Sequence, residues 1–181
     1  IVQGASSSRP GLLFSSQFTR ATGIYMINLG FSGNSKMQEC LADYIVNVKD
    51  VDAIVVDGMS NPNVKEIRSR FDTFISRLRE ANPGVPIIVL PPAFRELRLV
   101  NTRYNEHFNE QDQAAAEVVA AYIKNHKDDK DFYYLPKVRF NNTADGFQTT
   151  DGVHSNDLSY YFFLKDFTPA VTKILKKYRL K

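Results

Sequence analysis

The sequence predicts an α/β fold, a three-layer α/β/α sandwich built around a parallel sheet. Short apolar runs typical of buried strands alternate along the chain with longer segments whose apolar residues recur every three or four positions. The 181 residues are enough to bury one core, and the chain contains no linker or internal repeat. We therefore expect a single domain over residues 1–181.

Four short apolar runs predict the strands. They are residues 24–30, 53–56, 86–90 and 132–135. Their continuous apolar character suits parallel strands that are buried on both faces. Pro91 and Pro92 directly follow the third run and are expected to end it.

Helices are expected between these runs, at about residues 11–22, 37–48, 64–78, 104–123 and 158–175. Asn82-Pro83-Gly84 ends the third of them, and Pro169 is a candidate break in the last. Cys40 falls on the apolar stripe of residues 37–48, so we expect it in the core. A doubly wound fold should also have a strand before the loop of residues 4–11, and none is present in the chain there.

The composition argues against several classes of function. The formal net charge is only +3 and the basic residues are spread over polar helix faces, so nucleic acid is not an expected partner. The three histidines are scattered and there is one cysteine, which leaves no metal-ligand set. No phosphate-binding glycine motif indicates a nucleotide, and no apolar run reaches the ~20 residues of a membrane span. We expect neither a cofactor nor a metal.

Polar residues gather in the loops that follow predicted strands, where parallel α/β sheets place their sites. These loops contain residues 30–34 (GFSGN), 57–62 (DGMSNP) and 151–157 (DGVHSND). Together they supply a histidine with a carboxylate three residues away, a backbone N–H in a glycine turn, and an asparagine amide. Acyl transfer needs these parts: a base, a group that orients the base, and donors for the developing oxyanion.

These blocks resemble, in order, those of the SGNH (GDSL-like) hydrolase family of serine esterases, in its bacterial acylhydrolase-type subgroup. Residues 1–11 (IVQGASSSRPG) are similar to the second half of the first family block, whose nucleophilic serine would stand immediately before Ile1. The resemblance implies that Gly33 and Asn61 form the oxyanion hole. It also implies that Asp151 and His154 are the catalytic Asp-x-x-His pair.

The activity implied by the resemblance is hydrolysis of carboxylic esters through an acyl-serine intermediate, with acyl esters of carbohydrate or lipid as substrates. His154 would act as the base and Asp151 would orient it. The nucleophile and the central strand that carries it are expected upstream of Ile1, so residues 1–181 alone should be inactive or very weakly active. Relatives in this subgroup often carry an additional N-terminal domain, which we also expect here.

Several residues rival the predicted site residues. Ser32 lies between a predicted strand and a helix, like the serine of a nucleophile elbow, although Asn34 replaces the last glycine of that motif. Asn63 is a second candidate for the oxyanion amide. Asp145 and Asp157 are alternatives for the orienting carboxylate, but Asp157 is better explained as the N-cap of the last helix.

Two alternatives at the level of function stay open. A non-catalytic ligand- or carbohydrate-binding module could use the same scaffold. A flavodoxin-like ligand-binding domain without hydrolase ancestry would share the alternation of strands and helices. The remaining histidines, His107 and His126, lie on or at the end of a predicted helix and are expected at the surface.

Overall fold

A computed structural model describes residues 1–142 and 146–180 and divides the chain into two compact units. The first unit comprises Ile1–Ser32, Ala93–Asn109 and Lys137–Lys181, and the second comprises Gly33–Pro92 and Glu110–Pro136. Each unit joins segments that are far apart in the sequence. Its core therefore depends on long-range contacts.

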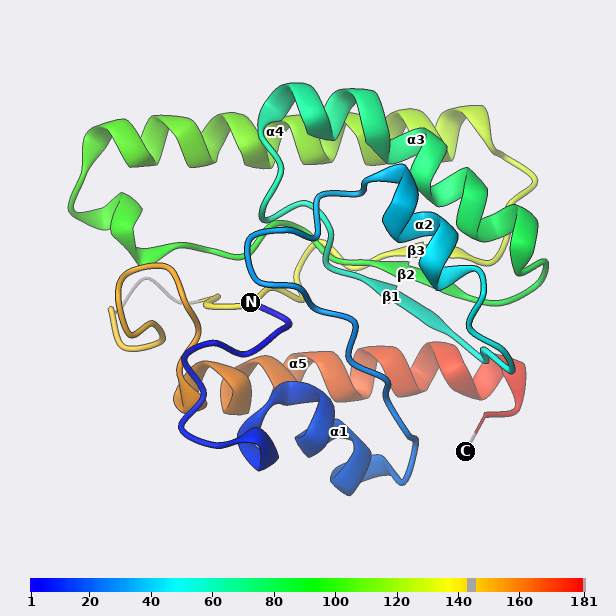
Figure 1. The fold of residues 1–181 in the computed structure, drawn as a ribbon, viewed down its shortest axis with the longest axis horizontal. Coiled ribbons are helices and arrows are strands. Elements are labelled where there is room, and N and C mark those ends of the chain that lie inside the picture. Colours follow the sequence, from blue (N-terminus) through cyan, green and yellow to red (C-terminus); the bar gives the residue numbers. More distant parts are fainter. Residues whose placement is uncertain (143–145, 181) are drawn as a thin grey trace. The chain divides into compact units, whose positions relative to one another are not determined.

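The second unit contains a parallel sheet with the strand order β1-β2-β3 (Figure 1). The strands are β1 (Ile54–Val56), β2 (Ile87–Val89) and β3 (Phe132–Tyr134). Ile54 lies opposite Ile87, which in turn lies opposite Phe132. Three of the four expected strands and the parallel α/β class are thus confirmed. All three residues of β2 are buried, as a central parallel strand requires.

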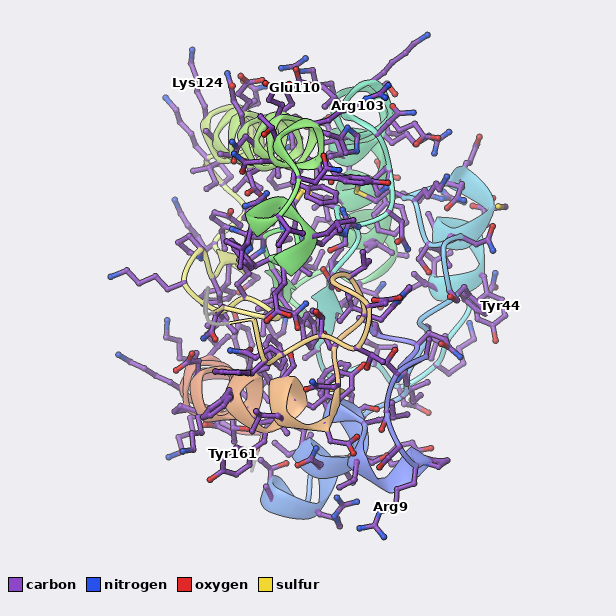
Figure 2. The ribbon with its side chains drawn as sticks, turned by 90° about the vertical axis from the view of Figure 1, so that its left-hand side faces the viewer. Arg9, Tyr44, Arg103, Glu110, Lys124 and Tyr161 are labelled. Atoms are coloured by element: carbon purple, nitrogen blue, oxygen red, sulfur yellow. The ribbon has the colours of Figure 1, made fainter. Side chains whose placement is uncertain are left out.

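Three helices accompany this sheet: α2 (Glu39–Ile45), α3 (Val64–Ala81) and α4 (Thr102–Asn125), which begins in the first unit. Within the second unit, α3 and the later part of α4 lie along one face of the sheet (Figure 1). The core between them is aliphatic and aromatic, and each buried side chain of this size contributes roughly 1.5–3 kcal/mol. It includes Ile67, Phe71, Ile75 and Leu78 of α3 and Val119 and Tyr122 of α4. The charged side chains of Glu110 and Lys124 project outward from α4 (Figure 2).

The expectations for residues 37–48 are partly wrong. The helix is shorter, because Met37 has a positive φ of 56° and therefore lies outside it. Cys40 is exposed, whereas Ala42 is buried in the core. Ala42 of α2 joins the core cluster that contains Ile67 and Phe71 of α3, whereas Cys40 does not.

The first unit consists of helices around an aromatic core. It contains η1 (Pro10–Leu12), α1 (Phe14–Thr22), η2 (Glu96–Leu99), α5 (Asp157–Leu175) and η3 (Lys176–Tyr178). Phe14 of α1 packs edge-on against Phe163 and Phe167 of α5, at ring distances of 5.7 and 5.9 Å. The break expected at Pro169 is absent, and α5 continues through this residue.

The expected strand at residues 24–30 does not form among the described residues. The N–H of Met26 donates to the hydroxyl of Thr19 at 3.1 Å, and the N–H of Gly30 donates to Asn28 Oδ1 at 2.9 Å. Tyr25 is 80% exposed and Ile27 54% exposed. Exposed and partly buried residues still alternate along the first part of this segment, as in a strand. These two backbone N–H groups, however, form hydrogen bonds with side chains and not with a neighbouring strand.

Candidate active site

Asp151 and His154 form a hydrogen-bonded pair in a turn of the first unit, in the loop that precedes α5 (Figure 1). Asp151 Oδ2 lies 2.7 Å from His154 Nδ1. Asp151 Oδ1 accepts the backbone N–H groups of His154 at 2.8 Å and of Val153 at 3.0 Å. One carboxylate thus holds both the turn and the imidazole. We call residues 151–154 the Asp-His turn.

The ionisation of Asp151 determines which nitrogen of His154 carries the proton. Burial raises the pKa of the Asp151 carboxyl, but hydrogen bonds from the His154 backbone, the His154 ring and the Val153 backbone outweigh it and lower the pKa to about 2. The carboxylate therefore only accepts hydrogen bonds at neutral pH, so Nδ1 of His154 is the protonated nitrogen. Nε2 has no hydrogen-bond partner among residues 1–142 and 146–180. In this tautomer Nε2 is the basic atom of the neutral ring.

The turn depends on Gly152, whose φ of +84° lies in a region that side chains disfavour. A Cβ on Gly152 would lie 3.1 Å from Cβ of Leu97 in η2. The Leu97 N–H donates to the carbonyl of Gly152 at 2.8 Å. The loop around the turn is closed by the N–H of Asn156, which donates to the carbonyl of Gln148 at 3.0 Å.

The N-terminal segment is fastened to the start of α5, just after the Asp-His turn. The Tyr160 hydroxyl donates to the carbonyl of Ile1 at 3.0 Å. Asp157 Oδ1 accepts the backbone N–H of Ser8 at 3.0 Å, and hydrogen bonds from Ser8 and Ser7 lower the pKa of the Asp157 carboxyl. The sequence suggested Asp157 as the N-cap of α5, and this prediction is wrong. Asn156 is the cap, because its side chain accepts the N–H of Ser159.

In the second unit, Gly33 and Asn61 lie in the loops where the sequence placed them. Gly33 is exposed and has a φ of +67°, and among the described residues no atom beyond its own chain neighbours lies within 4 Å of the place that a Cβ would occupy. Asn61 follows β1 and is half-buried. Asn63 caps α3, since its Oδ1 accepts the N–H of Glu66 at 2.9 Å while its own N–H donates to the Glu66 carboxylate. The carbonyl oxygen of the Asn63 side chain is thus used as the cap of this helix.

The other candidate residues are dispersed. Ser32 is exposed, and Asp145 lies outside the described residues. His107 is exposed on α4. His126 is half-buried, and its Nε2 forms a hydrogen bond with Asp72 Oδ1 at 2.9 Å. Among the described residues, no group of three or more His, Cys, Asp or Glu side chains is placed to hold a metal ion. In that same part of the chain, no helix combines the length and apolar character needed to cross a bilayer.

A cavity in the second unit contains none of the predicted site residues. It has a volume of about 310 Å³ and lies where α4 ends and β3 begins. Its lining consists of Tyr122, Ile123, His126, Lys127, Asp129, Lys130 and Phe132.

Two buried polar residues that the sequence did not single out support the loop before α5. Asn141 is fully buried, and its Oδ1 accepts the hydroxyls of Ser155 at 2.8 Å and Ser159 at 2.6 Å. Glu96 is 7% exposed and accepts the backbone N–H of Gln148 at 2.8 Å. Neither residue belongs to a local motif, because their partners are 14 to 52 positions away.

The chain belongs to the GDSL-like lipase/acylhydrolase family, whose pattern it matches over residues 1–172. It is similar to a protein from Bacteroides ovatus ATCC 8483 that is described as a GDSL-like lipase, with 39% identity and a TM-score of 0.89. The match covers 97% of this chain and 51% of that protein, so the chain spans about half the length of this relative. Family membership excludes the alternative of a flavodoxin-like domain without hydrolase ancestry.

Two further structures share the fold at low identity. The salicylyl-acyltransferase SsfX3 from a tetracycline biosynthetic pathway is 17% identical with a TM-score of 0.74, covering 96% of this chain and 52% of that one. A mutant acetyl esterase with an acetate ion is 14% identical with a TM-score of 0.59, covering 96% of this chain and 94% of the other. No curated protein matches the chain significantly. The α/β sandwich predicted from the sequence is confirmed by these matches.

Proposed function

We propose that the intact protein is a serine esterase that hydrolyses carboxylic esters through an acyl-serine intermediate. The observation that carries the proposal is the Asp151–His154 pair, whose 2.7 Å contact leaves Nε2 of the imidazole basic. Membership of a lipase and acylhydrolase family supports the same class of reaction. The pair supplies a base and its orienting carboxylate, which are two of the three members of a catalytic triad.

In the proposed mechanism, Nε2 of His154 removes the proton of the serine hydroxyl while the serine oxygen attacks the ester carbonyl. The imidazolium then returns this proton to the leaving alcohol, and Asp151 stabilises the positive ring without being protonated itself. The family resemblance assigns the backbone N–H of Gly33 and the side-chain amide of Asn61 to the oxyanion. A water molecule, deprotonated by His154, releases the acid in the second half of the reaction.

We place the nucleophilic serine immediately before Ile1. Residues 1–11 resemble the second half of the family's first block, and this similarity is the basis for the assignment. The bond from Tyr160 to the carbonyl of Ile1 supports it, because it anchors this end of the segment to the helix that follows the Asp-His turn. Acyl esters of carbohydrate or lipid are the substrates that we propose.

The first test compares p-nitrophenyl acetate hydrolysis by residues 1–181 with hydrolysis by the protein extended upstream. We expect activity in the extended protein alone. A fluorophosphonate probe followed by mass spectrometry should label the serine before position 1, since only an activated serine reacts. Equal activity of the two proteins, or labelling of Ser32, would contradict the upstream assignment. No labelling and no hydrolysis by either protein would favour a non-catalytic binding module.

The second test compares two histidines in the extended protein. We expect His154→Ala to lower kcat by roughly 10⁴-fold or more, because the serine then lacks its base. His107→Ala is the matched control, since His107 is exposed on α4, and it should leave kcat unchanged. Similar activity of both variants would rule out His154 as the base.

A further inference from the structure

We propose that Glu96 and Thr149 are positioning residues that hold the Asp-His turn in its hydrogen-bonded geometry. This inference deepens the proposed function and rests on it for the role of the turn. Both residues lie outside the Asp-x-x-His motif, and the family resemblance assigns neither of them a role. They belong to the first unit together with the turn itself.

The carboxylate of Glu96 is a buried anchor for the loop. Its Oε1 accepts the backbone N–H of Gln148 at 2.8 Å, and its Oε2 accepts the backbone N–H of Thr149 at 3.0 Å as well as the Thr149 hydroxyl. Glu96 is 7% exposed, so its charge is stabilised mainly by these donors rather than by water. Charge-assisted hydrogen bonds of this kind are stronger than neutral ones.

The hydroxyl of Thr149 connects Glu96 to the Asp-His turn. It donates its proton to Glu96, and its oxygen accepts the backbone N–H of Gly152 at 3.1 Å. The carbonyl of Gly152 is held by the N–H of Leu97, the residue after Glu96, at 2.8 Å. Both backbone polar groups of Gly152 are therefore tied to η2, one through Thr149 and the other directly.

The Asp-His turn needs such support because its own side chains are open to solvent. The Asp151 side chain is 53% exposed and that of His154 is 41% exposed. Water competes for hydrogen bonds at this exposure, and even a charged pair contributes little by itself when it is exposed. Gly152 stands between the two residues at a positive φ, so fixing its N–H and carbonyl sets the direction in which the chain returns from Asp151 to His154. The buried Glu96 thus restrains an exposed pair that it does not touch.

The test uses two substitutions of Thr149. Thr149→Val keeps the shape of the side chain but removes the hydroxyl, and Thr149→Ser keeps the hydroxyl. Thr150→Val is the matched control, because Thr150 is exposed and its hydroxyl makes no hydrogen bond to the described residues. Glu96→Gln is a fourth variant, in which an NH₂ group replaces one acceptor oxygen and must face a donor of the loop.

The first readout is NMR on residues 1–181, which does not depend on esterase activity. The Asp151 carboxyl signal in the unmodified chain should stay that of an ionised group down to low pH, since its pKa is about 2. In Thr149→Val and in Glu96→Gln this signal should begin to titrate at a higher pH, and the resonance of the ring proton shared by Asp151 and His154 should weaken. Thr149→Ser and Thr150→Val should resemble the unmodified chain.

The second readout is ester hydrolysis by the upstream-extended protein. We expect Thr149→Val to lower kcat by roughly 10- to 100-fold with little change in KM, since a small displacement of a catalytic group affects the reaction more than binding. The proposal is overturned if Thr149→Val lowers only the melting temperature and leaves the Asp151 titration as in Thr150→Val. It is also overturned if Thr149→Ser is as defective as Thr149→Val. If the extended protein hydrolyses no ester, the proposed function fails, whereas the NMR comparison still decides the positioning role.

Discussion

Gly152→Ala should destabilise the first unit by more than the free-energy cost of placing a side chain at a positive φ. A side chain at a positive φ such as +84° costs roughly 1–2 kcal/mol. The new Cβ would also lie 3.1 Å from Leu97 Cβ and 3.3 Å from the Leu97 Cα and N atoms, which are backbone and cannot rotate away. Shifting Leu97 weakens its hydrogen bond to Gly152, worth about 1 kcal/mol. The expected loss in free energy of unfolding is about 2–3 kcal/mol.

Gly23→Ala is the matched control for Gly152→Ala. Gly23 belongs to the same unit and has a φ of +74°, but in the part of the chain that the structure describes no atom other than those of its chain neighbours lies within 4 Å of a Cβ at this position. It should therefore cost only the conformational part, roughly 1–2 kcal/mol. Thermal unfolding followed by circular dichroism should place the melting temperature of Gly152→Ala roughly 2–4 °C below that of Gly23→Ala. Equal melting temperatures would refute the argument that η2 holds the turn by close packing.

Two further predictions separate roles that neighbouring residues share. In the extended esterase, Asn61→Ala should lower kcat by roughly 10²–10³-fold, because it removes an oxyanion donor. Asn63→Ala should instead cost about 1 kcal/mol of stability, because it removes the cap of α3, and should leave kcat nearly unchanged. The reverse pattern would make Asn63 the donor. The hydrogen bonds from Ser8 and Ser7 lower the pKa of Asp157 below its ordinary 3.8, so they stabilise the fold above that pH and are lost as the pH falls through the lowered value. Backbone hydrogen exchange of residues 1–13, corrected for intrinsic rates, should therefore become faster in acid in the unmodified chain. In Asp157→Asn the exchange should already be fast and should not depend on pH. Equal protection in both proteins would exclude the anchoring role.

The sequence alone was sufficient where local pattern and buried environment agree. The apolar runs at 53–56, 86–90 and 132–135 are strands, because a run with no polar face can only be buried on both sides of a parallel sheet. The stripe of α3 also lies where its spacing placed it, whereas the sequence offered Asn63 only as a rival oxyanion amide and the structure makes it the cap of α3. The pairing of Asp151 with His154 is local too, since both belong to one four-residue turn.

Tertiary structure decided the features that depend on distant partners. Residues 24–30 have the alternation of a strand, but a strand exists only when a neighbouring chain accepts its hydrogen bonds, and no described segment does so in a ladder. Cys40 has the spacing of a core residue, yet it is exposed, and Ala42 is the residue of α2 that joins the core.

The support of the candidate site lies at the same level. The sequence showed that an aspartate, a glycine and a histidine share one turn, because their spacing is short and their chemistry is specific. It could not show that Glu96 fastens Thr149, since the two are 53 positions apart and no periodicity connects them. Burying a carboxylate is unfavourable unless hydrogen-bond donors surround it. For Glu96 these donors come from a distant part of the chain, so only folding brings them together.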